Sequence, residues 1–223
     1  MLKTTLINIA SFVILFLFLL ASQSIISQND TINTAFRKGR WLTGLSGNIS
    51  STTTQLDNTD FKTTSNNYGI NIESGKFLKN RWLVGGLFQA NKASTSGTIE
   101  KTTETFYIGP FSNYYFMDGN TGSLFGRLSL GYVRYRDETE FMTQNIVTQN
   151  FSEGGGLGSI VGVGYSYTMN DFIAFDLGIN VNLFWVSIEQ ETLPIQTISN
   201  TNISSNDISF SFGFNIILDD FFF

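Results

Sequence analysis

The sequence predicts an all-β protein whose eight antiparallel strands close into an up-and-down transmembrane β-barrel, behind a cleaved N-terminal signal peptide. Three observations predict this fold. An apolar run at residues 12–21 is too short to cross a bilayer as a helix. After Arg40 the apolar residues recur with a period of two, which is the period of a strand. Short turns and long polar stretches alternate between the periodic segments, as in outer-membrane barrels.

The N-terminal segment has the pattern of a Sec-type signal for export. Lys3 supplies a positive start, the apolar run follows, and small or polar residues after Ala21 can supply a cleavage site before Gln28. A transmembrane helix is the alternative, but the run falls short of the required length. We therefore expect residues 1–24 to be the signal peptide.

The rest of the chain divides into two parts by its hydrophobic pattern. Residues 25–39 have no period-two pattern and are expected to form a short N-terminal periplasmic segment. Residues 40–223 are expected to form the outer-membrane β-barrel domain.

The first four strands are expected at residues 41–49, 68–72, 82–91 and 106–116. Apolar residues alternate with polar residues or glycine in the first two, which indicates one face toward lipid and one toward the lumen. The third segment could place either face outward, and the fourth contains Pro110, so the alternation does not fix their facing.

The last four strands are expected at residues 124–132, 161–167, 173–185 and 208–218. In residues 173–185 large apolar side chains alternate with Ala, Asp, Gly and Asn. Residues 208–218 repeat that pattern against Ser, Gly and Asn. A soluble sandwich would also alternate, but its exposed face would carry more Lys and Glu than these strands do. The small uncharged faces favour a crowded lumen, and a strand edge in hydrocarbon then requires closure of the barrel.

The connections follow the barrel plan. Tight turns are expected at residues 78–81, 117–122 and 169–171. Long polar loops are expected at residues 53–63, 95–101, 137–149 and 189–204. Aromatic residues gather near both ends of the strands, where headgroup belts are expected. The belt at the short-turn end comprises Phe77, Trp82, Tyr114, Tyr115, Phe116, Tyr165, Tyr167 and Phe172.

Several segments together resemble a known family. RWLTGLSG, NRWLVGGL, FYIGPFSNYYF, SLFGRLSLGY and GLGSIVGVGYSYTMNDFIAFDLGINV are similar to the outer-membrane beta-barrel domain family, which shares its architecture with OmpX and the membrane part of OmpA. The resemblance spans about residues 40–218 and implies the fold rather than a function. Relatives often carry a basic residue where this chain has Asn113, so the resemblance does not transfer their lumen charge network. The terminal Phe223 resembles the signal read by the outer-membrane assembly machinery, although Asp219 and Asp220 interrupt the alternation before it.

Composition excludes several kinds of chemistry. The chain has no Cys and no His, which removes disulfides, thiolate metal sites and the commonest general base. The net charge is −5 with no basic patch, so no nucleic-acid partner is expected. Barrel enzymes that act on lipids resemble one another in using a His beside a Ser, and this chain lacks the His. We expect no enzyme activity, no cofactor and no metal.

Three charged residues fall on the faces assigned to the lumen: Glu73, Arg127 and Asp176. An isolated charge in a narrow lumen is unfavourable, so each needs a partner. The hypothesis is that Arg127 pairs with Glu73 or with Asp176 and closes the interior. The alternative is a gate or ion pathway, although eight strands leave an interior that side chains can fill.

The long loops hold a second set of charges. Carboxylates in the third and fourth loops are expected to be exposed and are the candidate contacts for a partner or a cation: Asp137, Glu138, Glu140, Glu189 and Glu191. A solvated repulsive surface is the alternative, since no ordered ligand spacing is present.

The sequence therefore predicts an integral outer-membrane protein with a structural or surface-interaction role. Its expected partners are outer-membrane lipid, the assembly machinery and a molecule at the cell surface. A narrow channel, a component of a secretion apparatus and a soluble lipocalin-like binder of apolar ligands are the alternatives.

Overall fold

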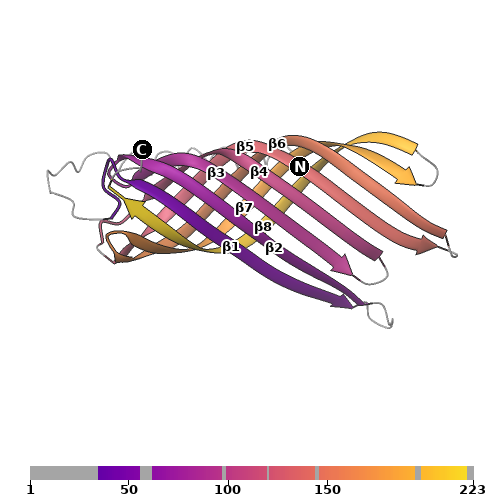
Figure 1. The fold of residues 1–223 in the computed structure, drawn as a ribbon, viewed down its shortest axis with the longest axis horizontal. Coiled ribbons are helices and arrows are strands. Elements are labelled where there is room, and N and C mark those ends of the chain that lie inside the picture. Colours follow the sequence, from indigo (N-terminus) through magenta and orange to yellow (C-terminus); the bar gives the residue numbers. More distant parts are fainter. Residues whose placement is uncertain are drawn as a thin grey trace, which may run out of the picture. The chain divides into compact units, whose positions relative to one another are not determined.

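The computed structural model describes residues 35–55, 62–96, 99–119, 121–143, 146–193 and 197–219. The predicted signal peptide and Phe223 lie outside these residues. The eight strands, labelled in Figure 1, are β1 (Trp41–Gln55), β2 (Lys62–Lys79), β3 (Trp82–Ser96), β4 (Ile99–Tyr115), β5 (Gly122–Thr143), β6 (Ile146–Asn170), β7 (Ile173–Leu193) and β8 (Thr197–Leu218).

The strands form one closed antiparallel barrel in sequence order. Each strand pairs with the next along the chain, and β1 pairs with β8 to close the ring. The predicted fold class, eight antiparallel up-and-down strands in a barrel, is confirmed. No helix among the described residues is long and apolar enough to span a bilayer.

Large apolar side chains cover the outside of the barrel. Among the most exposed are Leu130, Leu157, Val163, Ile208 and Phe210, at 59–74% exposure. Small polar residues such as Ser166 and Asn180 face inward and are buried. This arrangement opposes the lipocalin-like alternative, which needs its apolar residues inside.

The structure fixes the facing of the two strands that the alternation left open. In β3, Leu83 and Leu87 are buried in the lumen and Phe88 faces outward. In β4, Tyr107 is buried in the lumen, whereas Pro110 is exposed on the outside. The pairing of β4 with β5 is interrupted at Pro110, because a proline has no N–H to donate to the neighbouring strand.

The long polar loops expected at one end are mostly strand. β5 continues to Thr143 and β6 begins at Ile146, so most of the segment expected as the third loop is paired strand. Likewise, β7 continues to Leu193 and β8 begins at Thr197. Thr, Ser, Asn and Gln form strands here because pairing with the neighbouring strands satisfies their backbone N–H and C=O groups. The strands thus extend far beyond the roughly 9–11 residues that cross a bilayer.

Candidate functional site

The lumen holds a buried ion pair that joins two strands three places apart in the ring. Arg127 on β5 reaches Glu73 on β2, and the Nη2–Oε2 distance is 2.5 Å. The same guanidinium donates from Nε to Oδ1 of Asn113 on β4 at 3.0 Å. The Arg127 and Glu73 side chains are only 9% and 8% exposed. Asn113 is therefore a hydrogen-bond acceptor for the arginine.

Asp176 lies beside this pair without joining it. Asp176, Glu73 and Arg127 line one enclosed cavity of about 10 Å³. No ion pair to Asp176 forms in the described part of the chain, and its Oδ1 has no hydrogen-bond partner. A cavity of that size has room for about one water molecule. The structure thus brings two of the three predicted lumen charges into contact and places the third next to them.

An aromatic cluster fills the lumen on the periplasmic side of the ion pair. Phe36, which precedes β1, stacks on Tyr115 with ring centroids 4.1 Å apart. Phe77 lies 6.0 Å from Phe36, and Phe125 lies 5.7 Å from Tyr115. Phe77 and Tyr115 were expected in a headgroup belt, but both are at most 1% exposed. Their positions face inward in the observed register, so they act as core residues.

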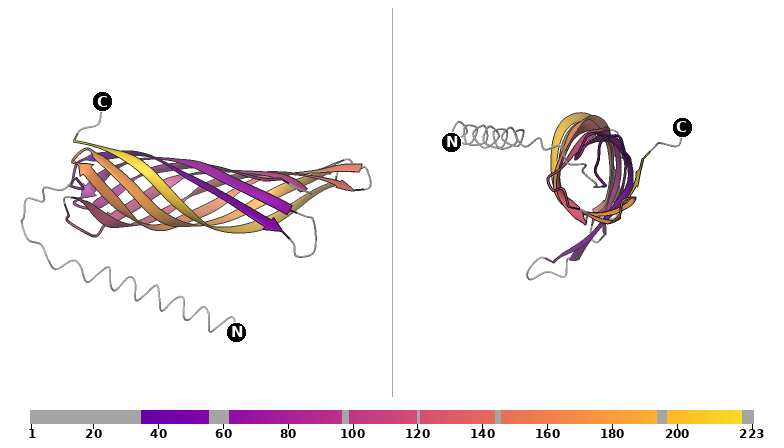
Figure 2. Two further views of the ribbon diagram at one scale, coloured as in Figure 1. Left: turned by 90° about the horizontal axis from the view of Figure 1, so that it is seen from below. Right: turned by 90° about the vertical axis from the view of Figure 1, so that its left-hand side faces the viewer.

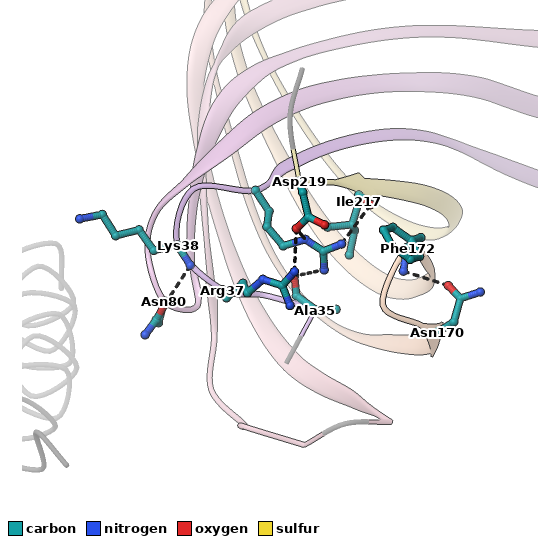
Figure 3. A network of polar contacts seen from close by, with 9 residues as sticks. Ala35, Arg37, Lys38, Asn80, Asn170, Phe172, Ile217 and Asp219 are labelled. Atoms are coloured by element: carbon teal, nitrogen blue, oxygen red, sulfur yellow. Dashed lines mark hydrogen bonds and ion pairs between the residues drawn. The ribbon is translucent and has the colours of Figure 1, made fainter. Parts of the chain in front are cut away.

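A polar clamp holds the chain ends at the same mouth, and Figure 3 shows its members. Asp219, directly after β8, accepts a hydrogen bond from Nη2 of Arg37 at 2.7 Å and lies 2.9 Å from Nε of Arg40. The Arg40 side chain is 2% exposed and also donates to the carbonyl oxygens of Ala35 and Ile217. The hydrogen bond from Arg37 lowers the pKa of Asp219 below its usual range. Burial lowers the pKa of Arg40, and Asp219 opposes that shift.

An apolar layer fills the lumen on the outer side of the ion pair. Tyr107 on β4 and Phe184 on β7 stack across the barrel with centroids 6.1 Å apart. Val133 and Ile160 are buried in the same core. The Tyr107 hydroxyl and the Ser129 hydroxyl lie 2.5 Å apart, so the tyrosine oxygen has a partner. The lumen is therefore filled at three successive levels.

The acidic residues expected in exposed loops lie on strands and separate into two groups. Asp137 faces the lumen at 9% exposure, against expectation, because odd-numbered residues of β5 point inward. Its Oδ1 accepts from the Thr103 hydroxyl at 2.6 Å and lies 3.2 Å from Nζ of Lys101.

The remaining four carboxylates, Glu138, Glu140, Glu189 and Glu191, alternate with inward-facing residues on the outer parts of β5 and β7. Glu138, Glu140 and Glu189 are exposed, and Glu191 is half-buried. No group of three or more metal-ligating side chains occurs within the described ranges.

Sequence reasoning missed the clamp and the cap formed by Phe36. Phe36 and Arg37 belong to the segment expected to be periplasmic, whereas Arg40 and Asp219 belong to the predicted barrel domain; Ala35 and Phe36 are buried in the barrel core. One signal was available. The two aspartates that interrupt the alternation at the end of the last strand mark a polar requirement at that mouth.

Comparison with known proteins shows that the fold of this chain is similar to that of solved outer-membrane barrels. No family model and no curated protein match the chain. A major outer membrane protein from Thermus thermophilus is similar at a TM-score of 0.50 and 8% identity, over 80% of this chain and 99% of that one. Neisserial surface protein A is similar at a TM-score of 0.45 and 13% sequence identity, over 80% of this chain and 97% of that one. The outer membrane protein OprG from Pseudomonas aeruginosa is similar at a TM-score of 0.46 and 11% sequence identity, over 83% of this chain and 99% of that one.

The small-barrel architecture predicted from the sequence is thus confirmed. A closed barrel with an apolar exterior belongs in a bilayer, where every backbone group of the spanning part is paired. Barrels with this strand plan lie in the outer membrane, which agrees with the location predicted from the sequence.

Proposed function

We propose that this chain is a non-enzymatic outer-membrane barrel with a closed lumen, which stabilises the envelope and presents its outer strands to the surroundings. The observation that carries the proposal is the filled interior. The aromatic cluster around Phe36, the Arg127–Glu73 pair and the Tyr107–Phe184 layer block the lumen in sequence. The lumen charges close the interior rather than select ions. Outer-membrane lipid and the assembly machinery are the partners that this proposal implies.

The test is a measurement of ion conductance after reconstitution. The purified barrel is first checked for heat modifiability, because a closed barrel migrates faster before boiling than after. In a planar bilayer, the wild-type protein and a Tyr107→Ala variant should both give no unitary steps. The variant removes the Tyr107–Phe184 layer and leaves the aromatic cluster around Phe36 and the Arg127–Glu73 pair in the lumen. Steps of constant size in the wild-type protein would favour the narrow channel and overturn the proposal.

The surface part of the proposal rests on the outward carboxylates. Register places Glu140 opposite Glu100, so like charges face each other on the outer strands; Glu189 lies opposite Glu153, which already pairs with Arg134. Facing like charges are unfavourable across a strand pair unless a cation or a cationic partner lies between them. The surface partner that fits is therefore positively charged.

This part is tested with a paired variant. We expect calcium to raise the unfolding temperature of the wild-type barrel more than that of Glu138→Gln/Glu140→Gln. Asp171→Asn is the matched control, because it removes an exposed carboxylate at the opposite mouth and should keep the calcium response. Equal calcium responses, together with equal adsorption of polylysine to cells carrying either form, would dispose of the surface role.

A further inference from the structure

The seam that closes the barrel is only partly paired. β1 pairs with β8 from Trp41–Leu218 to Gly47–Phe212 and no further. Beyond that point β1 still pairs with β2 as far as Gln55. β8 still pairs with β7 as far as Thr197. Above Gly47 and Phe212, therefore, β1 and β8 each present an edge with no described strand beside it. In the end-on view of Figure 2, the indigo β1–β2 hairpin leans away from the ring.

The open part of the seam begins within the apolar exterior. A rise of about 3.3 Å per residue and a tilt near 40° mean that about ten residues cover an apolar band of about 25 Å. Counted from Leu218, that length reaches Ile208. Ile208 and Phe210 face outward at 74% and 59% exposure, above the last pair at Phe212. Free strand edges are not tolerated against hydrocarbon alone, so polar atoms must meet them there.

A cavity of about 380 Å³ lies behind this opening. We call it the vestibule. Its lining includes Tyr68, Ile208 and Phe210 from the outside of the barrel as well as inward-facing residues, so it is continuous with the outer surface through the seam. Its floor is the apolar layer, where Phe184 stacks on Tyr107. A molecule in the vestibule thus has no path through the filled lumen below.

The two walls of the vestibule differ in chemistry. The β7–β8 side carries the large apolar residues Phe184, Val186, Ile203, Ile208 and Phe210, together with the polar residues Ser205, Asn206, Asp207 and Ser209. The opposite side, on β1 to β4, carries amides and hydroxyls, and its one described cation, Lys92, is paired with Glu104. A ligand that satisfies both walls has an apolar chain and a polar head.

The polar wall offers hydrogen-bond acceptors that have no donors. The Oδ1 atoms of Asn48, Asn67 and Asn91, on three adjacent strands, are buried and unpartnered. A Cβ at Gly69 would collide with the amide oxygens of both Asn48 and Asn91, so these two oxygens lie close together beside the Gly69 backbone. Asp207 adds a carboxylate to the lining. The head that fits here donates hydrogen bonds and is neutral or positive.

We propose that the outer part of the β1–β8 seam is a lateral doorway, through which the vestibule takes a single-chain amphiphile with an amine or hydroxyl head from the outer leaflet. The apolar chain of the ligand contacts Ile208 and Phe210 at the opening, and its head donates hydrogen bonds to the amide oxygens of Asn48 and Asn91. The blind floor makes the vestibule a binding or transfer site and not a pore. This inference adds a ligand to the closed barrel proposed above.

The doorway is tested by locking it. Continuing the β1–β8 register by three positions puts Ser50 opposite Ser209, and the chain has no native cysteine. Ser50→Cys/Ser209→Cys therefore forms a single reducible cross-link, or accepts a short bis-maleimide where the gap is too wide. Thr139→Cys/Asn150→Cys is the matched control, because that pair joins β5 and β6 where they are already neighbours and neither residue lines the vestibule. Each protein is placed in phosphatidylcholine nanodiscs.

The probe is dodecylamine with a photoreactive diazirine in its chain, and the labelled residues are located by mass spectrometry. We expect labels on β2, β7 and β8 around the vestibule, reduced at least tenfold in the locked protein. Reduction of the disulfide should restore labelling, and the control should label fully in both states. Equal labelling of the locked and reduced forms, or labels confined to the outer apolar face, would overturn the doorway.

Two further arms test the head site separately. The corresponding dodecanol probe should label as the amine does, whereas dodecanoate should label at least tenfold less. Gly69→Ser fills the space beside the amide oxygens of Asn48 and Asn91 and leaves the seam open, so it should lower amine labelling. Equal labelling by dodecanoate, or none of this loss in Gly69→Ser, would overturn the assignment of the head. Conductance of the wild-type barrel would refute the closed lumen without deciding the doorway.

Discussion

Two arginine–glutamate contacts in this barrel have the same length and opposite surroundings. Arg127 and Glu73 meet at 2.5 Å in the lumen, with side chains 9% and 8% exposed. Arg134 and Glu153 also meet at 2.5 Å, on the outside of the projecting strands, at 59% and 56% exposure. Distance alone would rank the two contacts as equals. Burial separates them, because water screens the outer pair and solvates either charge when its partner is removed.

The same contrast holds for the two halves of the barrel. Toward the periplasm the lumen is filled, the seam is paired and the chain ends are clamped. Toward the outside the strands continue as polar ribbons, and β1 separates from β8. Side-chain packing thus fixes the inner half, while the outer half combines backbone pairing with fewer buried side chains, such as Val186 and Ile188.

The largest effect is expected from Arg127→Ala. The substitution leaves Glu73 buried with no cation near it, and breaking such a pair costs about 3–5 kcal/mol of unfolding free energy. Urea unfolding of the barrel refolded in detergent micelles, followed by tryptophan fluorescence, measures the loss. A variant as stable as the wild-type protein would show that the pair does not hold the lumen together.

The control for that prediction removes both charges. In Glu73→Gln/Arg127→Met neither member of the pair is left as a lone charge, and we expect a smaller loss than in Arg127→Ala. If the double variant is as unstable as Arg127→Ala, lost packing rather than lost charge pairing is the cause. The greater contribution of Arg127 than of Arg134 to stability would then be explained by the packing of its side chain and not by its charge.

A steric prediction tests the packing of the inner half. A Cβ at Gly85 would collide with the backbone oxygen of Ser74, whereas a Cβ at Gly86 would meet nothing within 4 Å. Gly85→Ala should lower the unfolding free energy by about 2 kcal/mol, because the strands must shift apart. Gly86→Ala, one residue along the same strand, is the control and should change it by no more than about 0.5 kcal/mol. Equal effects at both positions would mean that strand propensity, and not close approach, sets the cost.

Sequence reasoning predicted the strands and most of their facing because alternation is a local property. It identified Arg127 as an inward charge that needs a carboxylate. It could not choose between Glu73 and Asp176, since that choice depends on the register of strands far apart in the chain. The contact between Arg40 and Asp219 joins the two ends of the barrel and has no local pattern. Asp137 was misplaced because a polar ribbon in water and a loop have the same composition.

The clamp at the periplasmic mouth is an intermediate case between the two arginine–glutamate pairs. Asp219 is half exposed, but its partner Arg40 is 2% exposed. The pKa of Asp219 is lowered in the folded state, so its contribution is complete at neutral pH and is lost as the pH falls through that lowered pKa. Asp219→Asn should lower the unfolding free energy at pH 7 by about 1 kcal/mol after allowance for screening.

The pH dependence separates the contribution of Asp219 from the destabilisation that acid causes through all the other carboxylates. Urea unfolding at pH 7 and at pH 3 should show a smaller difference for Asp219→Asn than for the wild-type protein. Lys38→Gln, a charge change in the same turn, serves as the control and should keep the wild-type difference. Parallel curves for all three proteins would show that Asp219 contributes no stability through its charge.

The smallest effect is expected from Glu153→Gln in the outer pair. The hydrogen bond from Arg134 lowers the pKa of Glu153, so the contact exists at neutral pH, yet both side chains lie mostly in water. The substitution should leave the urea midpoint unchanged, and 1 M salt should move wild-type and variant alike, because the pair is already screened. A fall in the urea midpoint as large as that of Arg127→Ala would contradict the difference between the buried and the exposed ion pair. It would mean that the projecting strands are held by their charges, and that equal contact lengths do report equal strengths in this barrel.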